Sequence, residues 1–537
     1  MSGTARTLAR AGLTVAGAYF ISRVLGWVRI VVITNQFHAG TELDAYFAAF
    51  RLPDAIFQLV AAGALSSAMI PVLATLFTRN EEDHAWRVVS TVLNIMLLAL
   101  SALAAIVAVF APQIVPIFTP GFDSVGTELT VRLTRIMLLS PVLLALGAVA
   151  SSVLNARGRF GAAAVAPSLY NLAIIGGALI LGPFLGVEAL AIGVVIGSML
   201  HLAVQIRPLL AEKFKLSFEI DLGDPNSRQV LTLMAPRALG LGANQITFIV
   251  ATTLATGVGV GAVTAYNVAW TVLQIPLGVI GFPLGVVLLP SLARAIAAGS
   301  VREFGTLIVR SVRLVLWIML FITAVGIVLR RQAVTLLFSP GLDAESIALT
   351  ADTLSFLFLG LAAHSLVIVF ARAFYSGHDT RTPVITALFD MVVCVVVGVA
   401  TVGSLGLSGI GLGLAAGAWA EASALGILLW RRTPGAGLEG ILQPLVMFLG
   451  GAILAAIATL IVVRLTDPII GTEPGRIALA LQIILAGGAG AVVYAVYTKL
   501  LKIPELGQSI DMFRSLARRG GGSGGAPPTD AGDSPGE

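Results

Sequence analysis

The sequence contains little charge and almost no cysteine. Of its 537 residues, 11% are Asp, Glu, Lys or Arg, against about 25% in an average soluble protein. Hydrophobic residues make up 57% of the chain, and the mean hydropathy is +0.96. This composition excludes an ordinary soluble protein, because no polar stretch remains from which a large water-exposed domain could be built. We expect a polytopic membrane protein of the all-α class.

The chain also lacks the residues of the common catalytic and metal sites. Its one cysteine, Cys394, lies in an apolar segment, which excludes a disulfide framework and a Cys/His metal site. The sequence has no phosphate-binding GxxxxGK[ST] loop and no recognisable arrangement of nucleophile and base. We therefore expect a protein that is not an enzyme, does not hydrolyse ATP itself, and needs no metal and no other cofactor.

Apolar stretches that are long enough to cross a bilayer recur from end to end. Crossing takes about 20 mostly apolar residues per helix. Apolar windows predict fourteen such spans, two sets of six followed by two more. Their approximate positions are 11–37, 45–77, 87–111, 129–154, 161–182, 187–209, 230–257, 263–292, 305–329, 347–374, 383–402, 407–430, 440–463 and 476–499.

Lysine and arginine are concentrated in alternate connections between these spans. Arg157 and Arg159 mark one such connection, whereas residues 112–131, in a connection of the other set, contain neither residue type. The positive-inside rule places the basic connections, and with them both termini, in the cytoplasm. The net charge of +5 is then a sign of topology and does not indicate a nucleic-acid partner. Arg330 and Arg331 are the main exception to this distribution.

A turn motif occurs twice, once in each half of the chain. The stretches VPIFTPGFDSVGTELT and VTLLFSPGLDAESIALT align Phe118 with Phe338 and Asp123 with Asp343, which are 220 residues apart. We call this separation the repeat offset. At nearly the same offset, IPVLATL in the first half matches LPSLARA in the second. Parallel halves related by an axis along the membrane normal are typical of carriers that rock around a central site. The predicted organisation is an N-lobe of spans 1–6 at 1–215, a C-lobe of spans 7–12 at 216–435, spans 13 and 14 at 436–505, and a cytoplasmic tail at 506–537, disordered from about 520.

The otherwise apolar run at 11–37 carries two arginines in the stretch SRVLGWVRIV. Arg23 lies about twelve residues, or roughly 18 Å, from the inner end of its span, near the bilayer middle. A charge there costs on the order of 2.5–3.5 kcal/mol on insertion scales, so we expect it to face a watery cavity or an anion. Arg29 lies about 9 Å farther along and about 120° around the helix; it either lines a second wall of that cavity or snorkels to the outer surface. Gly26 allows a neighbouring helix or a ligand to approach closely.

The second span begins with TELDAYFAAFRLPD and holds further candidates. Asp44 either orients an arginine of the cavity or, with Thr41, forms a capping box at the start of its own helix. Arg51 is a second candidate cation for the cavity, and Asp54 is its candidate partner. Pro53 permits the bend that a gating helix requires, although a bend without a gating role is equally consistent with it.

The second half supplies three more charged candidates. Arg237 in MAPRALG either faces Arg23 across the interface of the lobes or lies near the cytoplasmic end of its span. Asp390 and Glu421 are acids inside the eleventh and twelfth spans. They either bind a coupling cation or proton, or satisfy one another or Arg372. Arginines concentrated in the first lobe indicate an anionic, phosphate-bearing substrate, because arginine holds phosphate through paired hydrogen bonds.

The motifs SRVLGWVR, ELDAYFAAFRLPD, AAGALSSAMIPVL and HDTRTPV resemble those of the MurJ/MviN lipid II flippases, in the multidrug/oligosaccharidyl-lipid/polysaccharide exporter superfamily. The resemblance covers about residues 10–500. It implies a protein that moves the undecaprenyl-pyrophosphate-linked peptidoglycan precursor from the inner to the outer leaflet of the bacterial cytoplasmic membrane. It also implies that Arg23 and Arg29 lie near the pyrophosphate, that Asp44 acts at the outer side, and that spans 13 and 14 form a groove for the lipid tail.

The sequence departs from the family pattern in both lobes. Some members carry an arginine where this chain has Phe57, and another where it has Thr271, the position we expect to support the cavity. The Asn or Asp residues linked to sodium in some members appear here as Cys394 and Gly398. These departures weaken the expectation of sodium coupling. An inside-negative potential alone favours outward release of an anion by about 2.3 kcal/mol per charge per 100 mV.

Three further hypotheses follow from these departures. Arg51 and Arg237 compensate for the missing arginines; or the chain is a paralogue that flips another polyprenyl-linked glycan; or it is a non-transporting membrane scaffold for wall synthesis. The partners we expect are the lipid-linked precursor, membrane lipids, and proteins of cell-wall synthesis and division. No nucleic acid is expected among them.

Overall fold

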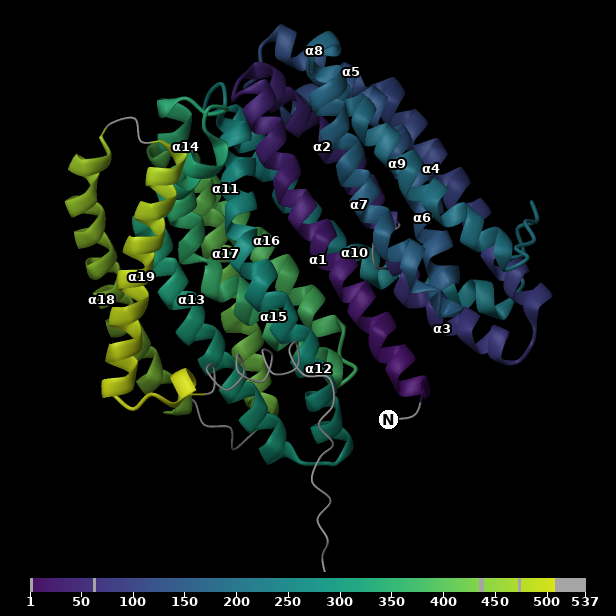
Figure 1. Ribbon diagram of the computed structural model, residues 1–537. Coiled ribbons are helices and arrows are strands. Elements are labelled where there is room, and N and C mark those ends of the chain that lie inside the picture. Colours follow the sequence, from purple (N-terminus) through teal and green to yellow (C-terminus); the bar gives the residue numbers. More distant parts are fainter. Residues whose placement is uncertain (1–2, 61–63, 434–438, 472–474, 508–537) are drawn as a thin grey trace, which may run out of the picture.

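The computed structural model describes residues 3–60, 64–433, 439–471 and 475–507, and within these ranges the chain is helical without a β-strand (Figure 1). The expected all-α class is therefore confirmed. A bilayer favours this outcome, because a helix satisfies its backbone hydrogen bonds within one segment.

The first half of the chain, which we call the N-lobe, contains nine helices and one π-helical turn within the described residues. They are α1 (Gly3–Phe37), α2 (Thr41–Val60), α3 (Ala64–Thr78), α4 (Glu82–Phe118), α5 (Ser124–Met137), α6 (Leu139–Ala156), α7 (Phe160–Gly176), the π-helical turn η1 (Gly177–Leu181), α8 (Gly182–Leu185) and α9 (Glu188–Ala211).

The second half comprises the C-lobe, α10 to α17, and an appended pair, α18 and α19. The bounds are α10 (Pro225–Thr256), α11 (Ala262–Pro276), the π-helical turn η2 (Leu277–Gly281), α12 (Phe282–Ala297), α13 (Val301–Phe338), α14 (Ala344–Leu359), α15 (Leu361–Ser376), α16 (Arg381–Leu405), α17 (Leu407–Arg432), α18 (Glu439–Ile470) and α19 (Arg476–Leu500). Figure 1 shows the N-lobe on one side, the green C-lobe on the other, and the yellow pair α18 and α19 at the outer flank of the C-lobe, beside α13.

Eleven helical segments of the described chain are long and apolar enough to cross a membrane, or twelve when α14 and α15, bent by 42° at their junction, form one span. The predicted total of fourteen is not confirmed. The two expected spans outside this count are 45–77 and 230–257. The first includes most of α2, a 20-residue helix that carries Glu42, Asp44, Arg51 and Asp54 and is therefore less apolar than a typical span. The second lies in α10, where the side chains of residues 235–241 are outside the described part.

The repeated turn motif has the same local structure in both halves. Asp123 precedes α5 and its side chain accepts a hydrogen bond of 2.7 Å from Gly126 N; Asp343 precedes α14 and accepts one of 2.8 Å from Ser346 N. Each aspartate thereby satisfies a free N–H at the start of a helix. Phe118 and Phe338 are both buried. The motif therefore fixes the same helix start in each lobe.

An ion pair also recurs at the repeat offset, with its charges exchanged. Arg159 pairs with Glu212 in the N-lobe, and Asp379 pairs with Arg432 in the C-lobe. In the N-lobe the pair joins the start of the fifth expected span to the end of the sixth. In the C-lobe it joins the start of the eleventh to the end of the twelfth. Both halves therefore keep the contact, while the sign at each position is reversed.

The connection after α9 runs along the N-lobe before α10 begins. Asn94 Nδ2 on α4 donates hydrogen bonds to the carbonyls of Ser217 at 2.8 Å and Glu219 at 3.2 Å. The expected boundary between 215 and 216 stays a prediction. The largest apolar cluster takes residues from both lobes, including Ile33 in the first and Tyr266 in the second, so the two lobes pack on one another.

Candidate functional site

Arg23 lies on α1, and its guanidinium reaches the C-lobe. Its Cζ atom lies 4.6 Å from the centre of the Phe282 ring on α12, a cation–π distance. Gly278 in η2 makes room for this side chain, since a Cβ there would lie 2.7 Å from Arg23 Nε. The Nε atom is buried and has no hydrogen-bond partner among the described residues. Arg23 therefore lies at the interface of the lobes with hydrogen-bonding capacity left for an anion.

Arg29 lies farther along α1 and is half-buried. Its charge acts on the carboxyl group of Asp54 and the hydroxyl groups of Tyr46 and Tyr170, which belong to α2 and α7 of the same lobe. Its Nε is also buried without a hydrogen-bond partner. The burial of Nε argues against the snorkelling alternative. The two arginines thus face different walls, as their separation of about 120° around the helix predicts.

Asp44 is fully buried and contacts the other lobe. Its Oδ2 accepts a hydrogen bond of 2.7 Å from Gly261 N, and its Oδ1 accepts bonds from Thr264 N at 2.7 Å and Thr264 Oγ1 at 2.6 Å. Gly261 is the N-cap residue of α11, where free N–H groups and the helix dipole favour a negative charge. Asp44 therefore caps α11 across the lobe interface, an arrangement different from both alternatives weighed from the sequence.

Arg51 makes a second connection between the lobes. Its Nε donates to Thr252 Oγ1 on α10 at 2.9 Å, and its Nη2 donates to Asn267 Oδ1 on α11 at 2.7 Å. The Phe248 and Tyr266 rings lie 5.5 and 5.9 Å from its Cζ. Both acceptors are uncharged. Arg51 therefore connects α2 to the C-lobe while its positive charge is not neutralised by them.

Three residues expected to support a cavity have ordinary packing. A Cβ at Gly26 would meet only Asn171 Nδ2, at 4.0 Å, so no neighbouring helix requires glycine there. Pro53 is buried within α2. The hydroxyl group of Thr271 donates to Asn267 O in its own helix at 2.7 Å. The alternative that remains for Gly26 is room for a ligand.

Asp390 and Glu421 are brought together by the packing of α16 on α17. A Cβ at Gly417 would overlap Asp390 Oδ1, so this carboxylate lies directly against α17. Glu421 lies one turn farther along α17 and interacts electrostatically with Asp390. Arg372, the candidate partner, packs against α12 instead. Arg237 lies on α10, but its side chain is outside the described residues.

The two Pro-Gly turns are visible in the sequence, but their contacts are not. A Cβ at Gly121 would overlap the carbonyl of Thr256 at the end of α10, and a Cβ at Gly341 would overlap that of Thr34 near the end of α1. Gly341 N also donates to Asn35 Oδ1 at 3.2 Å. Each turn therefore packs on the first helix of the opposite lobe, and only glycine permits so close an approach. The repeat of the turn motif was the one feature of the sequence that pointed to these contacts.

These contacts lie toward one end of the molecule, where α1 ends and both α2 and α11 begin. The cap by Asp44, the hydrogen bonds of Arg51 and the two glycine turns all join one lobe to the other there. Arg23 lies deeper along α1, about twenty residues before the position of Asp44 in the chain. The lobes are thus closed on one another beyond the arginine.

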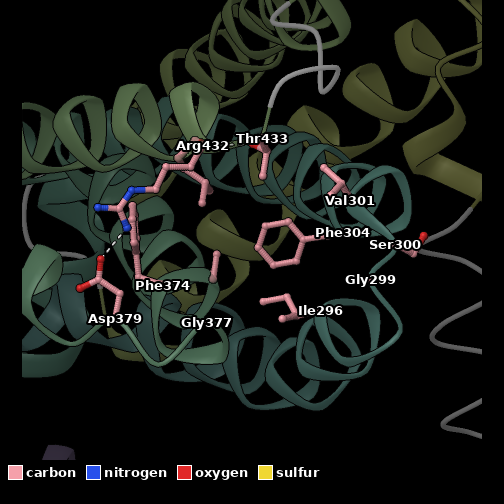
Figure 2. A pocket seen from close by; sticks show the side chains of 12 residues that line it. Ile296, Gly299, Ser300, Val301, Phe304, Phe374, Gly377, Asp379, Arg432 and Thr433 are labelled. Carbon is pink, nitrogen blue, oxygen red and sulfur yellow. Dashed lines mark hydrogen bonds and ion pairs between the residues drawn. The ribbon is translucent and has the colours of Figure 1, made fainter.

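A cavity of about 310 Å³ lies elsewhere in the C-lobe, at the ends of α12, α15 and α17 (Figure 2). Apolar side chains such as Phe304 and Phe374 line it, and at its edge Arg432 Nη1 pairs with Asp379 Oδ2 at 2.5 Å. Two hydrogen bonds from Thr382 also reach this carboxylate. Burial alone would raise the pKa of Asp379, but the bonds from Thr382 and Arg432 outweigh burial and hold it well below its usual range.

The N-lobe fills the equivalent space with large side chains. Arg157 Cζ lies 3.8 Å from the centre of the Phe77 ring and 5.9 Å from that of Trp86. The position that corresponds to Arg157 is Gly377, and the alignment of IPVLATL with LPSLARA places Ile296 and Gly305 opposite Phe77 and Trp86. Arg157 and Trp86 are therefore replaced by glycines in the C-lobe, which leaves room for the cavity, whereas Ile296 at the Phe77 position lines it. None of the residues expected at the site from sequence lines it.

Comparison with known proteins gives a consistent result. A family sequence profile described as "Lipid II flippase MurJ" matches residues 33–473. A Rhizobium meliloti protein named "Probable lipid II flippase MurJ" is 30% identical over 518 residues, which are 94% of this chain and 96% of the relative. A Burkholderia cenocepacia protein named "Lipid II flippase MurJ" is 31% identical over 459 residues, 84% and 89% of the two chains.

Two solved structures share the fold. One, titled "Lipid II flippase MurJ, inward closed conformation", aligns with a TM-score of 0.76 and 23% identity, over 91% of this chain and 98% of the other. An inward-facing multidrug resistance MATE family transporter of the MOP superfamily aligns with a TM-score of 0.65 and 17% identity, over 77% and 95%. At these identities the likeness shows the fold alone.

Proposed function

This chain belongs to the lipid II flippase MurJ family, and we propose that it carries lipid II, the undecaprenyl-pyrophosphate-linked peptidoglycan precursor, from the inner to the outer leaflet of the bacterial cytoplasmic membrane. A flippase moves its substrate without changing it chemically, so the chain acts in cell-wall synthesis as a transporter and not as an enzyme. Its partners are then the precursor and the membrane lipids around it.

The observation that carries this proposal is the pair of arginines on α1. Arg23 and Arg29 lie within a membrane-spanning helix, and each has a buried Nε without a hydrogen-bond partner. A buried donor left unsatisfied costs about 1–3 kcal/mol, and more when it is charged. A pyrophosphate would satisfy both guanidinium groups through charge-assisted hydrogen bonds. We assign Arg23 the first contact, because it lies at the interface of the lobes.

We further propose that the lobes alternate between two arrangements. The end at which Asp44 caps α11 is the outer end, since the basic connections mark the opposite end as cytoplasmic. Release to the outer leaflet requires the Asp44 cap, the Arg51 hydrogen bonds and the glycine turns to separate. Pro53 and the π-helical turn η2 lie in the helices α2 and α11–α12 that must then move.

The driving force is the membrane potential in this proposal. An inside-negative potential favours outward movement of each negative charge by about 2.3 kcal/mol per 100 mV. Asp390 and Glu421 offer a proton or cation a second route for coupling, because the two acids lie together on α16 and α17. Transport that survives collapse of the potential but stops without sodium would remove the potential from the proposal.

A second candidate substrate has one observation in its favour. Phe57 packs among apolar neighbours, and the Thr271 hydroxyl group is used within its own helix. The chain therefore lacks two cations that some relatives of the family carry. A different polyprenyl-linked glycan with the same pyrophosphate would still fit Arg23 and Arg29.

The direct test uses cells depleted of their own flippase. Outer-leaflet exposure of lipid II is measured after supplying the chain, its Arg23→Ala variant, or Arg135→Ala as a matched control. Arg135 is an exposed arginine of α5 whose Nε donates only to Ala108 O. We expect exposure to be restored by the chain and by the control, and to be lost with Arg23→Ala at equal expression. Well-expressed chain that restores nothing would contradict lipid II as the substrate.

A further inference from the structure

Four arginines lie at the outer end of α13 and the appended helices, against the general distribution of charge. Arg330 and Arg331 lie on α13, eight and seven residues before its end at Phe338. Arg464 lies on α18, six residues before its end, and Arg476 begins α19. We call these four residues the outer arginine cluster. Cationic residues are normally scarce on the outer side of a membrane protein.

The four arginines lie on three helices that pack on one another. Leu329 on α13, Val463 on α18 and Ala486 on α19 form one small apolar cluster. Arg330 directly follows the first of these residues and Arg464 directly follows the second. Arg330 and Arg464 therefore lie at the level of this apolar cluster, and Arg476, which donates to Ser339 O, lies nearer the end of α13.

The internal repeat provides a control for this feature. The positions one repeat offset before Arg330 and Arg331 are Phe110 and Ala111 on α4. Phe110 is 51% exposed and Ala111 is buried, as is ordinary for a helix in lipid. The fold therefore does not require arginine at these positions. The charges occur in the lobe that packs against α18 and α19 (Figure 1).

The cluster retains positive charge after its contacts are counted. Arg330 pairs with Asp352 at 3.6 Å, but its buried Nε has no hydrogen-bond partner. Arg476 donates to the carbonyl of Ser339, which is uncharged. Arg331 and Arg464 are exposed, and no ion pair joins either to an acid within the described ranges.

The acid nearest in sequence to Arg464 is held by another residue. Asp467 Oδ1 accepts a hydrogen bond of 2.8 Å from Gln482 Nε2, and the same nitrogen lies 2.9 Å from Thr466 Oγ1. Gln482 is 2% exposed, so this contact is fixed between α18 and α19. Asp467 is thereby held toward α19, and within the described ranges no ion pair joins it to Arg464.

We propose that the outer arginine cluster binds the negatively charged phosphate group of a lipid in the outer leaflet. Guanidinium groups hold phosphate with paired hydrogen bonds, and arginines at this depth reach the headgroup region by extending along the helix. The phosphate belongs either to a resident anionic phospholipid or to the pyrophosphate of the transported lipid after its release. The assignment of this end to the outer leaflet rests on the proposed function.

The test measures lipid binding beside the cluster, independently of transport. Leu465→Trp places a fluorescent side chain at a position that is 66% exposed and adjacent to Arg464. The full chain with this change is reconstituted in phosphatidylcholine vesicles that contain brominated phosphatidylglycerol or brominated phosphatidylcholine as a quencher. Quenching by the chain without the added tryptophan is subtracted.

We expect phosphatidylglycerol to quench at a lower mole fraction than phosphatidylcholine. Replacing both Arg331 and Arg464 by Gln is expected to raise the required mole fraction by about fivefold for each arginine removed, since each contributes about 1 kcal/mol near a charged surface. The matched control is Arg132→Gln, which removes an outer arginine of the N-lobe, one that pairs with Glu188 at 3.2 Å. It should leave the quenching unchanged.

Added undecaprenyl pyrophosphate identifies the source of the phosphate. If undecaprenyl pyrophosphate displaces the brominated lipid at a lower mole fraction than unlabelled phosphatidylglycerol does, the phosphate is that of the transported lipid. If the two competitors act at equal mole fractions, it is that of a resident phospholipid. Either result supports the site. Equal quenching by the two brominated lipids, or a preference that persists in the Gln variant, would overturn it. Binding without any lipid II transfer would leave this site standing and contradict the proposed function instead.

Discussion

The two lobes share their turns and helix starts but differ in where they carry charge. Asp123 and Asp343 cap equivalent helices in the two halves. Arg51 on α2, by contrast, corresponds to Thr271 on α11 at the repeat offset. Charges that shape the fold recur in both halves, whereas the charges of the candidate site, Arg51 among them, do not. In the proposed function, the symmetric scaffold allows the lobes to move and the asymmetric charges bind the substrate.

The clearest asymmetry occurs where a residue meets its own counterpart. Thr264 lies one repeat offset after Asp44, and the two form hydrogen bonds with one another. Equivalent positions of a twofold repeat approach each other only near the axis that relates the halves. Two aspartates there would repel, and two threonines would leave the helix start without a negative charge. One acid and one hydroxyl group satisfy both requirements.

The largest expected effect comes from adding a methyl group to a duplicated turn. Gly341→Ala would place a Cβ 2.1 Å from the carbonyl oxygen of Thr34 on α1. The backbone of the turn and that of the helix have little freedom to separate. Overpacking of this kind costs about 1–3 kcal/mol or more. We expect the outer end to stay open and lipid II transfer to fall by more than tenfold. The measurement is the accessibility of single cysteines at the outer end to a membrane-impermeant reagent.

Gly40→Ala is the matched control for that change, because nothing lies within 4 Å of a Cβ there. It should leave accessibility unaltered. The equivalent change Gly121→Ala in the other turn should act like Gly341→Ala. Different outcomes for the two turns would show that the repeat has lost its functional symmetry at this end.

A smaller effect is expected from removing the cap on α11. Exchanging the two capping partners between the lobes should then restore it in part. Asp44→Asn keeps the shape but removes the charge, and we expect about a tenfold loss of transfer, corresponding to about 1.4 kcal/mol. Asp44→Thr combined with Thr264→Asp moves the acid to the other lobe. This exchange should recover more transfer than either single change does. Transfer by Asp44→Asn at the unaltered rate would show that the cap is not needed for closure.

The charge-exchanged ion pairs allow a comparison of stability. Arg432→Glu should lower the melting temperature through loss of the pair with Asp379, an effect of about 1 kcal/mol for a partly exposed contact. Adding Asp379→Arg copies the arrangement of Arg159 and Glu212 in the N-lobe and should restore it. A double variant no more stable than the single one would show that the two lobes need their particular signs.

The same pair predicts a pH dependence. The bonds from Thr382 and Arg432 keep the pKa of Asp379 well below its usual range. Its contribution to stability is therefore complete above the unfolded value of about 3.9 and is lost as the pH falls through the lower folded value. The difference in melting temperature between the chain and Asp379→Asn should stay constant from pH 7 to pH 4. It should shrink only below pH 4.

The smallest effect is expected at Gly26. Alanine there has room beside Asn171 Nδ2, and replacing glycine within a helix stabilises it by about 0.5–1 kcal/mol. We expect transfer within twofold of the unaltered chain. A large loss of transfer at unchanged melting temperature would instead place the substrate against this part of α1.

Much of the fold could be predicted because its signals are local. Apolar runs predict spans, and Asp123 and Asp343 mark helix starts within a few residues of themselves. The total of fourteen was not confirmed, since charges such as Asp44 and Arg51 make α2 less apolar than a span defined by composition. These charged groups form hydrogen bonds with the opposite lobe. A hydropathy profile contains no information on such contacts.

The contacts of the site were harder to predict because they depend on how the lobes dock. Asp44 was expected to orient an arginine or cap its own helix, and instead it caps α11. Arg51 was expected in a cavity, and its donors reach Thr252 and Asn267. No local pattern tells which helix a buried acid meets. The repeat offset, applied to Asp44, leads to Thr264 and would have found this partner.

The most direct test of the account is the rate of lipid II transfer across vesicles that contain the purified chain. Arg23 is the asymmetric charge on which the proposal rests, because the equivalent position of the C-lobe is Ala243. The account predicts that Arg23→Ala lowers the rate by more than tenfold, while Arg135→Ala leaves it unchanged. Equal rates for the chain and the Arg23→Ala variant would contradict the claim that this arginine binds the pyrophosphate.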